Sequence, residues 1–229
     1  MWLPKGAAEV ERQVAILALA TSGPMPVIGL RADGTTRETA IDAGRGRGRD
    51  VAPTVQALLG DAGLGVADLD GIVVDVGPGS FTGVRVGVTT AKTLAWAANV
   101  PLHAVDSLRM LAVSTDAAGS IITVRDAGRG TVYHAAFDAD RNPVHAPARG
   151  DVTEVQGLLE DATIVGEGAP ALVDAAGVDL PALDVTPSLG ALIDLIEQDA
   201  DATFAVAAHD LAPLYLQASA PERLRSGER

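Results

Sequence analysis

One segment of the chain combines residue types that suit either an anion site or a tight turn. It follows a predicted buried strand ending near Asp75 and opens a long predicted helix. Its glycines permit close backbone approach, Ser80 or Thr82 can cap the helix, and N–H groups at a helix start suit a phosphate. A strand-to-helix turn without a ligand explains the same pattern. The residues of this candidate motif are Gly77, Pro78, Gly79, Ser80, Phe81, Thr82 and Gly83.

The motif departs from the common glycine-rich and nucleophile motifs. It lacks the lysine of a Walker A loop and the spacing of GxGxxG, and Ser80 is not in a GxSxG elbow. Asp75 is a candidate for a metal or phosphate site, with a buried or turn-capping carboxylate as the favoured alternative. Asp126 and Arg129, in a second Gly-rich hairpin, suit either a polar ligand or local pairing within the turn.

Other residues that carry chemistry are scarce. The four histidines form no HxxxH or HExxH pair, and the chain has no cysteine for a thiol nucleophile, a disulfide or a zinc ribbon. Lysine occurs only as Lys5 and Lys92, and Lys92 suits a solvated charge or a salt bridge to a partner. We therefore predict no catalytic residues, no metal ligands and no cofactor bound by this chain alone.

The predicted helix over 81–98 has a stripe of small residues. Gly83, Gly87 and Ala91 recur every four positions, and an apolar face adjoins them. Such a helix is buried on more than one side, and the stripe lets a second helix approach closely. That second helix belongs either to the same chain, which is the favoured alternative, or to a partner.

The elements that position these residues form two groups along the chain. A three-strand meander opens the first, with Asp33-Gly34 as a hairpin turn, and a helix over 51–59 follows with Asp50 as its cap. A second helix capped by Asp106 extends to about Ala117. We predict an α/β protein of two similar halves with mixed sheets, the second half reduced. The remaining predicted elements are strands at 71–76, 101–105, 121–125, 132–137, 144–148 and 163–165, and helices at 152–160 and 188–198.

Composition excludes several classes of protein. The 229 residues are 48% hydrophobic, which excludes a disordered chain, and no run of 18 apolar residues suggests a membrane span. Without an apolar leader at the start, we expect a soluble cytoplasmic protein. The net charge of −13 is uneven, with 10 acidic and 9 basic side chains in residues 1–100 and 20 acidic and 8 basic in 101–229. An acidic chain does not hold nucleic acid through a general basic surface.

The sequence GPGSFTGVRVGVTTAKTLA at 77–95 resembles the signature of the TsaB (YeaZ) family. This bacterial family belongs to the machinery that makes threonylcarbamoyladenosine at position 37 of tRNA. Weaker landmarks agree in order: ILALAT near the start, RDAGRGTVYHAAF at 125–137, VGEG at 165–168 and PLYL at 213–216. The resemblance therefore extends over nearly the whole chain.

The resemblance implies an ASKHA (actin/Hsp70-like) fold, with one RNase H-like domain at 1–104 and a reduced one at 105–229. It also implies a non-catalytic scaffold or activator, an inactive paralogue of the TsaD transferase. Partners would be a TsaD-like transferase and a TsaE-like ATPase, with tRNA contacted indirectly and ATP or ADP only at a subunit junction. The implied partner interface, which also serves a homodimer, consists of Val55, Leu58, Val84, Gly87, Val88, Ala91, Lys92 and Ala95.

Two departures from the family pattern affect these expectations. The family's first strand usually ends in Asp-Thr, whereas this chain has Ala20-Thr21, which removes an oxygen ligand for a metal and argues against ATP hydrolysis. The Gly/Arg loop at 44–49 lacks a histidine common there. Its Arg45, Arg47 and Arg49 suit contacts to a partner or to tRNA phosphates, or form a solvated loop. A stand-alone enzyme, nucleotide-dependent or glycoprotease-like, and a self-associating binding module stay as alternatives.

Overall fold

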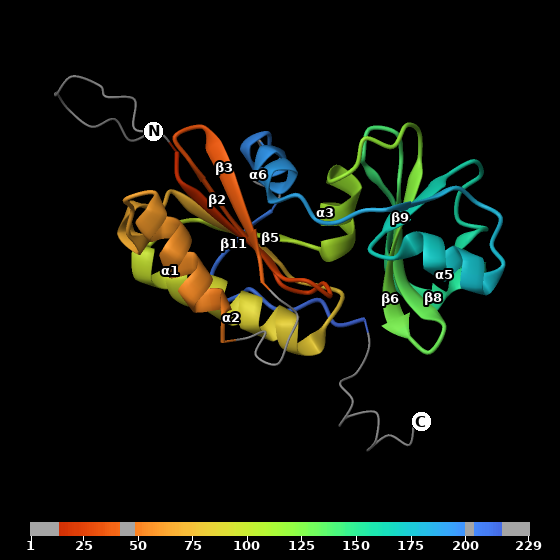
Figure 1. Cartoon of the computed structure of the whole chain (residues 1–229), viewed down its shortest axis with the longest axis horizontal. Coiled ribbons are helices and arrows are strands. Elements are labelled where there is room, and N and C mark those ends of the chain that lie inside the picture. The colour runs from red at the N-terminus through yellow and green to blue at the C-terminus, as the bar shows by residue number, and fades with distance from the viewer. Residues whose placement is uncertain (1–13, 42–48, 200–203, 217–229) are drawn as a thin grey trace, which may run out of the picture.

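The computed structural model describes residues 14–41, 49–199 and 204–216, which form two mixed β-sheets covered by helices (Figure 1). This arrangement confirms the predicted fold class of two α/β halves with mixed sheets. Arg45 and Arg47 lie outside the described residues, whereas Arg49 is described and exposed. Within the described ranges, no helix is both long enough and apolar enough to cross a membrane.

The first sheet has the strand order β11-β5-β4-β1-β2-β3. Its first three strands form the predicted antiparallel meander, and β4 and β5 run parallel to β1. The central strands β1 and β4 are buried along their whole length, as expected for strands covered on both faces. The elements of this half are β1 (Ile16–Ala20), β2 (Val27–Ala32), β3 (Thr35–Ala40), α1 (Val51–Asp61), the 3₁₀ helix η1 (Val66–Asp68), β4 (Gly71–Asp75), α2 (Phe81–Ala98) and β5 (Leu102–Val105).

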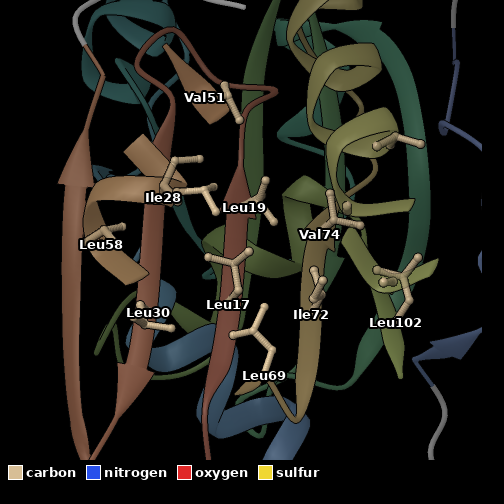
Figure 2. Packing of buried hydrophobic residues seen from close by; sticks show 14 of the residues in the cluster. Leu17, Leu19, Ile28, Leu30, Val51, Leu58, Leu69, Ile72, Val74 and Leu102 are labelled. Carbon is tan, nitrogen blue, oxygen red and sulfur yellow. The ribbon is translucent and has the colours of Figure 1, made fainter. Parts of the chain in front are cut away.

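Helices α1 and α2 cover one face of the first sheet. Figure 2 shows Val51 and Leu58 of α1 beside Leu17, Leu19 and Ile28 of the strands below. The opposite face is covered by α6 (Leu189–Glu197), which contributes Leu189, Leu192, Ile193 and Ile196 to a second apolar cluster. Both faces of the sheet are therefore closed by helices of the same chain.

The second sheet has the order β10-β9-β6-β7-β8, with β6, β7 and β8 antiparallel and β9 parallel to β6. Helix α3 packs on one face of it, while α4 and α5 pack on the other. Its elements are α3 (Ser107–Val113), β6 (Ile121–Gly128), β7 (Thr131–Phe137), β8 (Pro143–Asp151), α4 (Val152–Val155), β9 (Thr163–Gly166), α5 (Ala169–Ala176) and β10 (Ala182–Asp184).

The end of the described chain returns to the first sheet. Helix α6 packs on β1, β2 and β3, and β11 (Ala205–Val206) pairs antiparallel with β5. The predicted domain division at 104/105 stays a prediction, and elements from both sides of that boundary build the first sheet.

Several predicted elements have different bounds in the structure. Helix α3 ends at Val113, not near Ala117, because the Ser114 hydroxyl donates to the Met110 carbonyl and Thr115 accepts from the Ala117 amide. Helix α4 ends at Val155 instead of continuing to 160. Asp50 occupies the cap position of α1, but its side chain makes no capping hydrogen bond. Helix α5 and strands β10 and β11 were not predicted.

Candidate functional site

Asp75, the last residue of β4, is fully buried and joins two loops. One carboxylate oxygen accepts hydrogen bonds from the backbone N–H groups of Thr21 (2.8 Å) and Ser22 (2.9 Å), and the other accepts from Gly77 N–H (2.8 Å). The favoured alternative for Asp75, a buried carboxylate that organises a turn, is therefore confirmed. Ala20, at the position before Thr21, is buried in the apolar core.

The glycines of the motif allow the loop and helix α2 to touch the turn after β1. A Cβ atom on Gly79 would lie 2.4 Å from the Ser22 carbonyl oxygen, and one on Gly83 would lie 2.0 Å from that of Thr21. The Ser80 amide donates to the Ser22 carbonyl at 2.8 Å, and the Ser80 hydroxyl caps α2 by accepting from Gly83 N–H. Ser80 is thus the predicted cap, and Thr82 lies exposed in the first helical turn.

The second half of the chain meets this turn through a buried ion pair. Arg125 of β6 and Glu167, which follows β9, are 2.7 Å apart with side chains only 4% and 8% exposed. Arg125 also donates to the Ser22 hydroxyl and, at 3.4 Å, to the Pro78 carbonyl. Burial raises the pKa of Glu167, while Arg125 acts in the opposite direction. Pro78 of the motif and the neighbouring Ser22 therefore contact the second half.

Sequence reasoning did not identify Arg125 and Glu167 as a pair. Each directly follows an apolar run in the sequence, in ITVR and IVGE, and a charge at the end of such a run is the signal that was available. The partners are 42 residues apart in sequence and come together only when β6 and β9 pair.

The structure corrects the expectation that the small-residue stripe of α2 faces a partner. Gly87 lies against Thr21, whose hydroxyl would be 2.1 Å from an added Cβ. The stripe therefore packs within the chain, as the favoured alternative predicted, but its neighbour is the turn after β1 and not a second helix. Seven of the eight predicted interface residues are buried inside the chain: Val55, Leu58, Val84, Gly87, Val88, Ala91 and Ala95.

The surface that α1 and α2 leave open lies beside this buried stripe. It is an apolar groove of about 510 Å³ between the two helices and η1. Half-buried Leu94 of α2 lines it, and the Leu59 side of α1 forms the opposite wall. The lining residues are Ala52, Val55, Gln56, Leu59, Gly60, Leu64, Gly65, Val66, Thr90 and Leu94.

Lys92, the remaining predicted interface residue, holds the C-terminal segment of the described chain against α2. Its ammonium group donates to the carbonyl oxygens of Leu211 (3.0 Å) and His209 (3.5 Å). Figure 1 shows this segment, in blue, passing α2. Farther along, the Leu214 amide donates to the Val76 carbonyl at 2.7 Å. Lys92 is therefore half-exposed and fixes the C-terminal segment of the described chain to α2.

The other candidate residues have local roles. Asp126 accepts from Gly128 N–H at 2.7 Å within the β6–β7 turn, and Arg129 is exposed in the same turn. The turn interpretation of Asp126 is therefore confirmed. Among the described residues, no group of three or more acidic or histidine side chains is arranged to hold a metal ion.

Comparisons with known proteins show which family has this fold and motif. The structure superposes on YeaZ from Pseudomonas aeruginosa with a TM-score of 0.76 at 25% identity, covering 89% of this chain and 100% of that one. The architecture is therefore the two-sheet α/β fold of YeaZ, of the ASKHA type. A family model described as TsaD, tRNA N6-adenosine threonylcarbamoyltransferase, matches residues 42–183.

The chain belongs to this family, and its relatives identify the TsaB/YeaZ branch that its motif predicted. It is 42% identical over 122 residues to the tRNA threonylcarbamoyladenosine biosynthesis protein TsaB of Bacillus subtilis, covering 52% of this chain and 53% of that protein. It is 32% identical over 132 residues to TsaB of Escherichia coli, covering 56% and 57%. The matches therefore span about half the length of these relatives.

Proposed function

We propose that this chain is a subunit of the machinery for tRNA threonylcarbamoyladenosine biosynthesis, in which it binds a TsaD-like transferase. It acts as scaffold and activator, recruits a TsaE-like ATPase to the complex, and has no active site of its own. The names of the two TsaB relatives support the pathway. The observation that carries the partner role is the apolar groove between α1, α2 and η1.

The groove has the properties of a helix-binding surface. Its walls are helices α1 and α2 of the first half, and its lining combines apolar side chains with small residues such as Ala52 and Gly60. A partner helix can bury its apolar face there in the helix-in-groove manner. The same groove also suits a second copy of this chain, so a homodimer is the alternative occupant.

The motif supports a role without catalysis. The Asp75 carboxylate is already engaged by three backbone N–H groups, and the Ser80 hydroxyl accepts from the amide of its own helix. The loop carbonyl of Pro78 accepts from Ser107 and Arg125. All of these groups are therefore engaged in hydrogen bonds within the chain. In a catalytic loop, such groups would be free to contact a substrate.

Light scattering of this chain mixed with the TsaD-like transferase tests the partner role. Thr90→Arg places a charge at the groove wall and should abolish the heterodimer, because a buried unpaired charge costs several kcal/mol. Gln56→Arg changes an exposed side chain of α1 and should weaken the complex without affecting folding. Thr39→Arg, on the exposed edge strand β3, is the matched control and should leave the complex intact.

Two results would contradict this proposal. One is a wild-type chain that stays separate from the transferase at micromolar concentration, where an interface of about 1,600 Å² should hold a complex. The other is a complex that forms equally with all three variants. A homodimer that Thr90→Arg dissociates, without any heterodimer, would assign the groove to the alternative occupant.

A further inference from the structure

The side of α2 next to the C-terminal segment carries an aromatic and basic stripe. We define the stripe as Phe81, Arg85, Lys92 and Trp96 of α2 together with Tyr215. At 100° per residue, the four helical positions fall within about 60° of one another around the helix axis. Phe81 and Trp96 are 15 residues apart, so the stripe is about 22 Å long.

Three of these side chains already form a stack at the start of α2. The rings of Phe81 and Tyr215 are stacked with centroids 5.1 Å apart, and the Arg85 guanidinium lies 5.1 Å from the Phe81 centroid. Phe81 and Tyr215 are 38% and 45% exposed, so the stack is open to solvent. At the other end, Trp96 is 81% exposed beside a shallow pocket formed with Lys92, Thr93, Ala208 and His209.

The charge of α2 is opposite to that of the molecule. The helix has two cations and no acidic residue, in a chain whose net charge is −13. The described C-terminal segment at 204–216 contains one acidic residue, Asp210, whose side chain is 68% exposed and lies 3.3 Å from His209. The stripe is therefore a local basic and aromatic surface, even though the whole chain has no general basic surface.

We propose that the stripe binds single-stranded RNA. Aromatic side chains that stack on bases, beside cations that meet phosphates, are the combination that single-strand binders use. Here the exposed Arg85 supplies the phosphate contact, since Lys92 already donates to two backbone carbonyls. The 22 Å length suits a few extended nucleotides, with Tyr215 and Trp96 as the two stacking surfaces. The identity of that RNA as a tRNA loop rests on the proposed function. RNA contact itself follows from the stripe alone, and it differs from the indirect tRNA contact that sequence analysis expected.

Fluorescence anisotropy of a labelled, unmodified tRNA transcript with the isolated chain tests this proposal. Trp96→Ala should weaken binding about fivefold or more, because stacking on one base contributes that much affinity. Arg85→Ala should weaken binding and reduce the slope of log K against log salt by about 0.7, the value for one phosphate contact. Asp210→Asn should strengthen binding. Arg37→Ala, on the exposed strand β3, is the matched control and should leave the affinity unchanged.

A second measurement reports stacking directly. The chain has two tryptophans, so a Trp2→Phe variant leaves Trp96 as the reporter. The transcript should quench its fluorescence, whereas a poly-glutamate chain should not. Binding that Trp96→Ala and Arg85→Ala leave unchanged, no saturation by about 100 µM transcript, or equal quenching by poly-glutamate would overturn the proposal.

The test separates this proposal from the proposed function. Thr90→Arg should abolish the complex with the transferase and leave transcript binding unchanged, because Thr90 lines the groove on another side of α2. Transcript binding without a transferase complex would contradict the proposed function and support the RNA-binding stripe. A transferase complex without transcript binding would support the proposed function and overturn the RNA-binding stripe.

Discussion

At the residue scale, Asp75 links the ends of β1 and β4. Its carboxylate is fully buried and accepts three backbone hydrogen bonds, from Thr21, Ser22 and Gly77. The hydroxyl of Thr21 continues the connection by donating to the Gly83 carbonyl at 2.8 Å. This carboxylate therefore organises the junction between the first turn and the motif.

Asp75→Ala should destabilise the chain by about 3 kcal/mol or more. Three buried N–H groups lose their acceptor, and each unsatisfied group costs about 1–3 kcal/mol. Asp75→Asn keeps one acceptor oxygen and should cost less. Urea unfolding of the two variants measures both changes, and equal stability of wild type and Asp75→Ala would show that this carboxylate does not hold the junction.

At the element scale, α2 is defined by how closely it approaches the turn after β1. Gly83 and Gly87 touch Thr21, while the other sides of the helix border the groove and the stripe. The position of both surfaces therefore depends on glycines that face inward. Gly87→Leu would therefore disturb folding, so the loss of an assembly in that variant would not show that Gly87 lies in an interface.

Gly83→Ala should destabilise the chain by about 1–3 kcal/mol, the usual cost of overpacking. The added Cβ would lie 2.0 Å from the Thr21 carbonyl oxygen, a backbone atom that has little room to move. Gly60→Ala in α1 is the matched control, since no atom lies within 4 Å of its Cβ position. That variant should be stabilised by about 0.5–1 kcal/mol, because alanine favours a helix. Thermal unfolding compares the pair, and equal shifts would contradict this close approach.

Sequence predicted the long elements well because their signals are local. Helix α2 begins after its Ser80 cap and ends at Ala98, followed by Asn99 in a left-handed conformation, so its bounds agree with the prediction. Helix α5 was missed even though Gly168 and Gly177 bound it and Pro170 lies in its first turn. Strand β11 has two residues and is a strand only because β5 offers an edge to it.

At the scale of the whole molecule, the buried Arg125–Glu167 pair of the second half contacts the first half through Arg125. Both side chains are buried, and Arg125 reaches Ser22 and Pro78 of the first half. Sequence analysis recognised the motif but not what it contacts, because that contact needs two sheets to be placed against each other. What the small-residue stripe packs against was ambiguous for a similar reason, because its neighbour Thr21 lies 62 residues before Gly83 in the sequence.

Arg125→Met should destabilise the chain by about 3–5 kcal/mol, because Glu167 is left buried without its partner. Arg125→Met combined with Glu167→Leu should recover most of that stability, since removing both charges of a buried pair is often neutral. Urea unfolding measures the two stabilities, and hydrogen exchange of the Gly23, Gly77 and Gly79 amides should increase in both variants, because both lose the Arg125 hydrogen bonds to Ser22 and Pro78. Equal stability of the two variants would contradict the cost assigned to a buried, unpaired Glu167.

The most direct test of the proposed function is reconstitution of tRNA modification from purified components. Threonylcarbamoyladenosine formation is measured with the TsaD-like transferase, the TsaE-like ATPase and a tRNA transcript, with and without this chain. We expect modification to depend on the chain, to be lost with Thr90→Arg and to be retained with Thr39→Arg. Equal modification in the presence and absence of the chain would contradict its role as a subunit of this machinery.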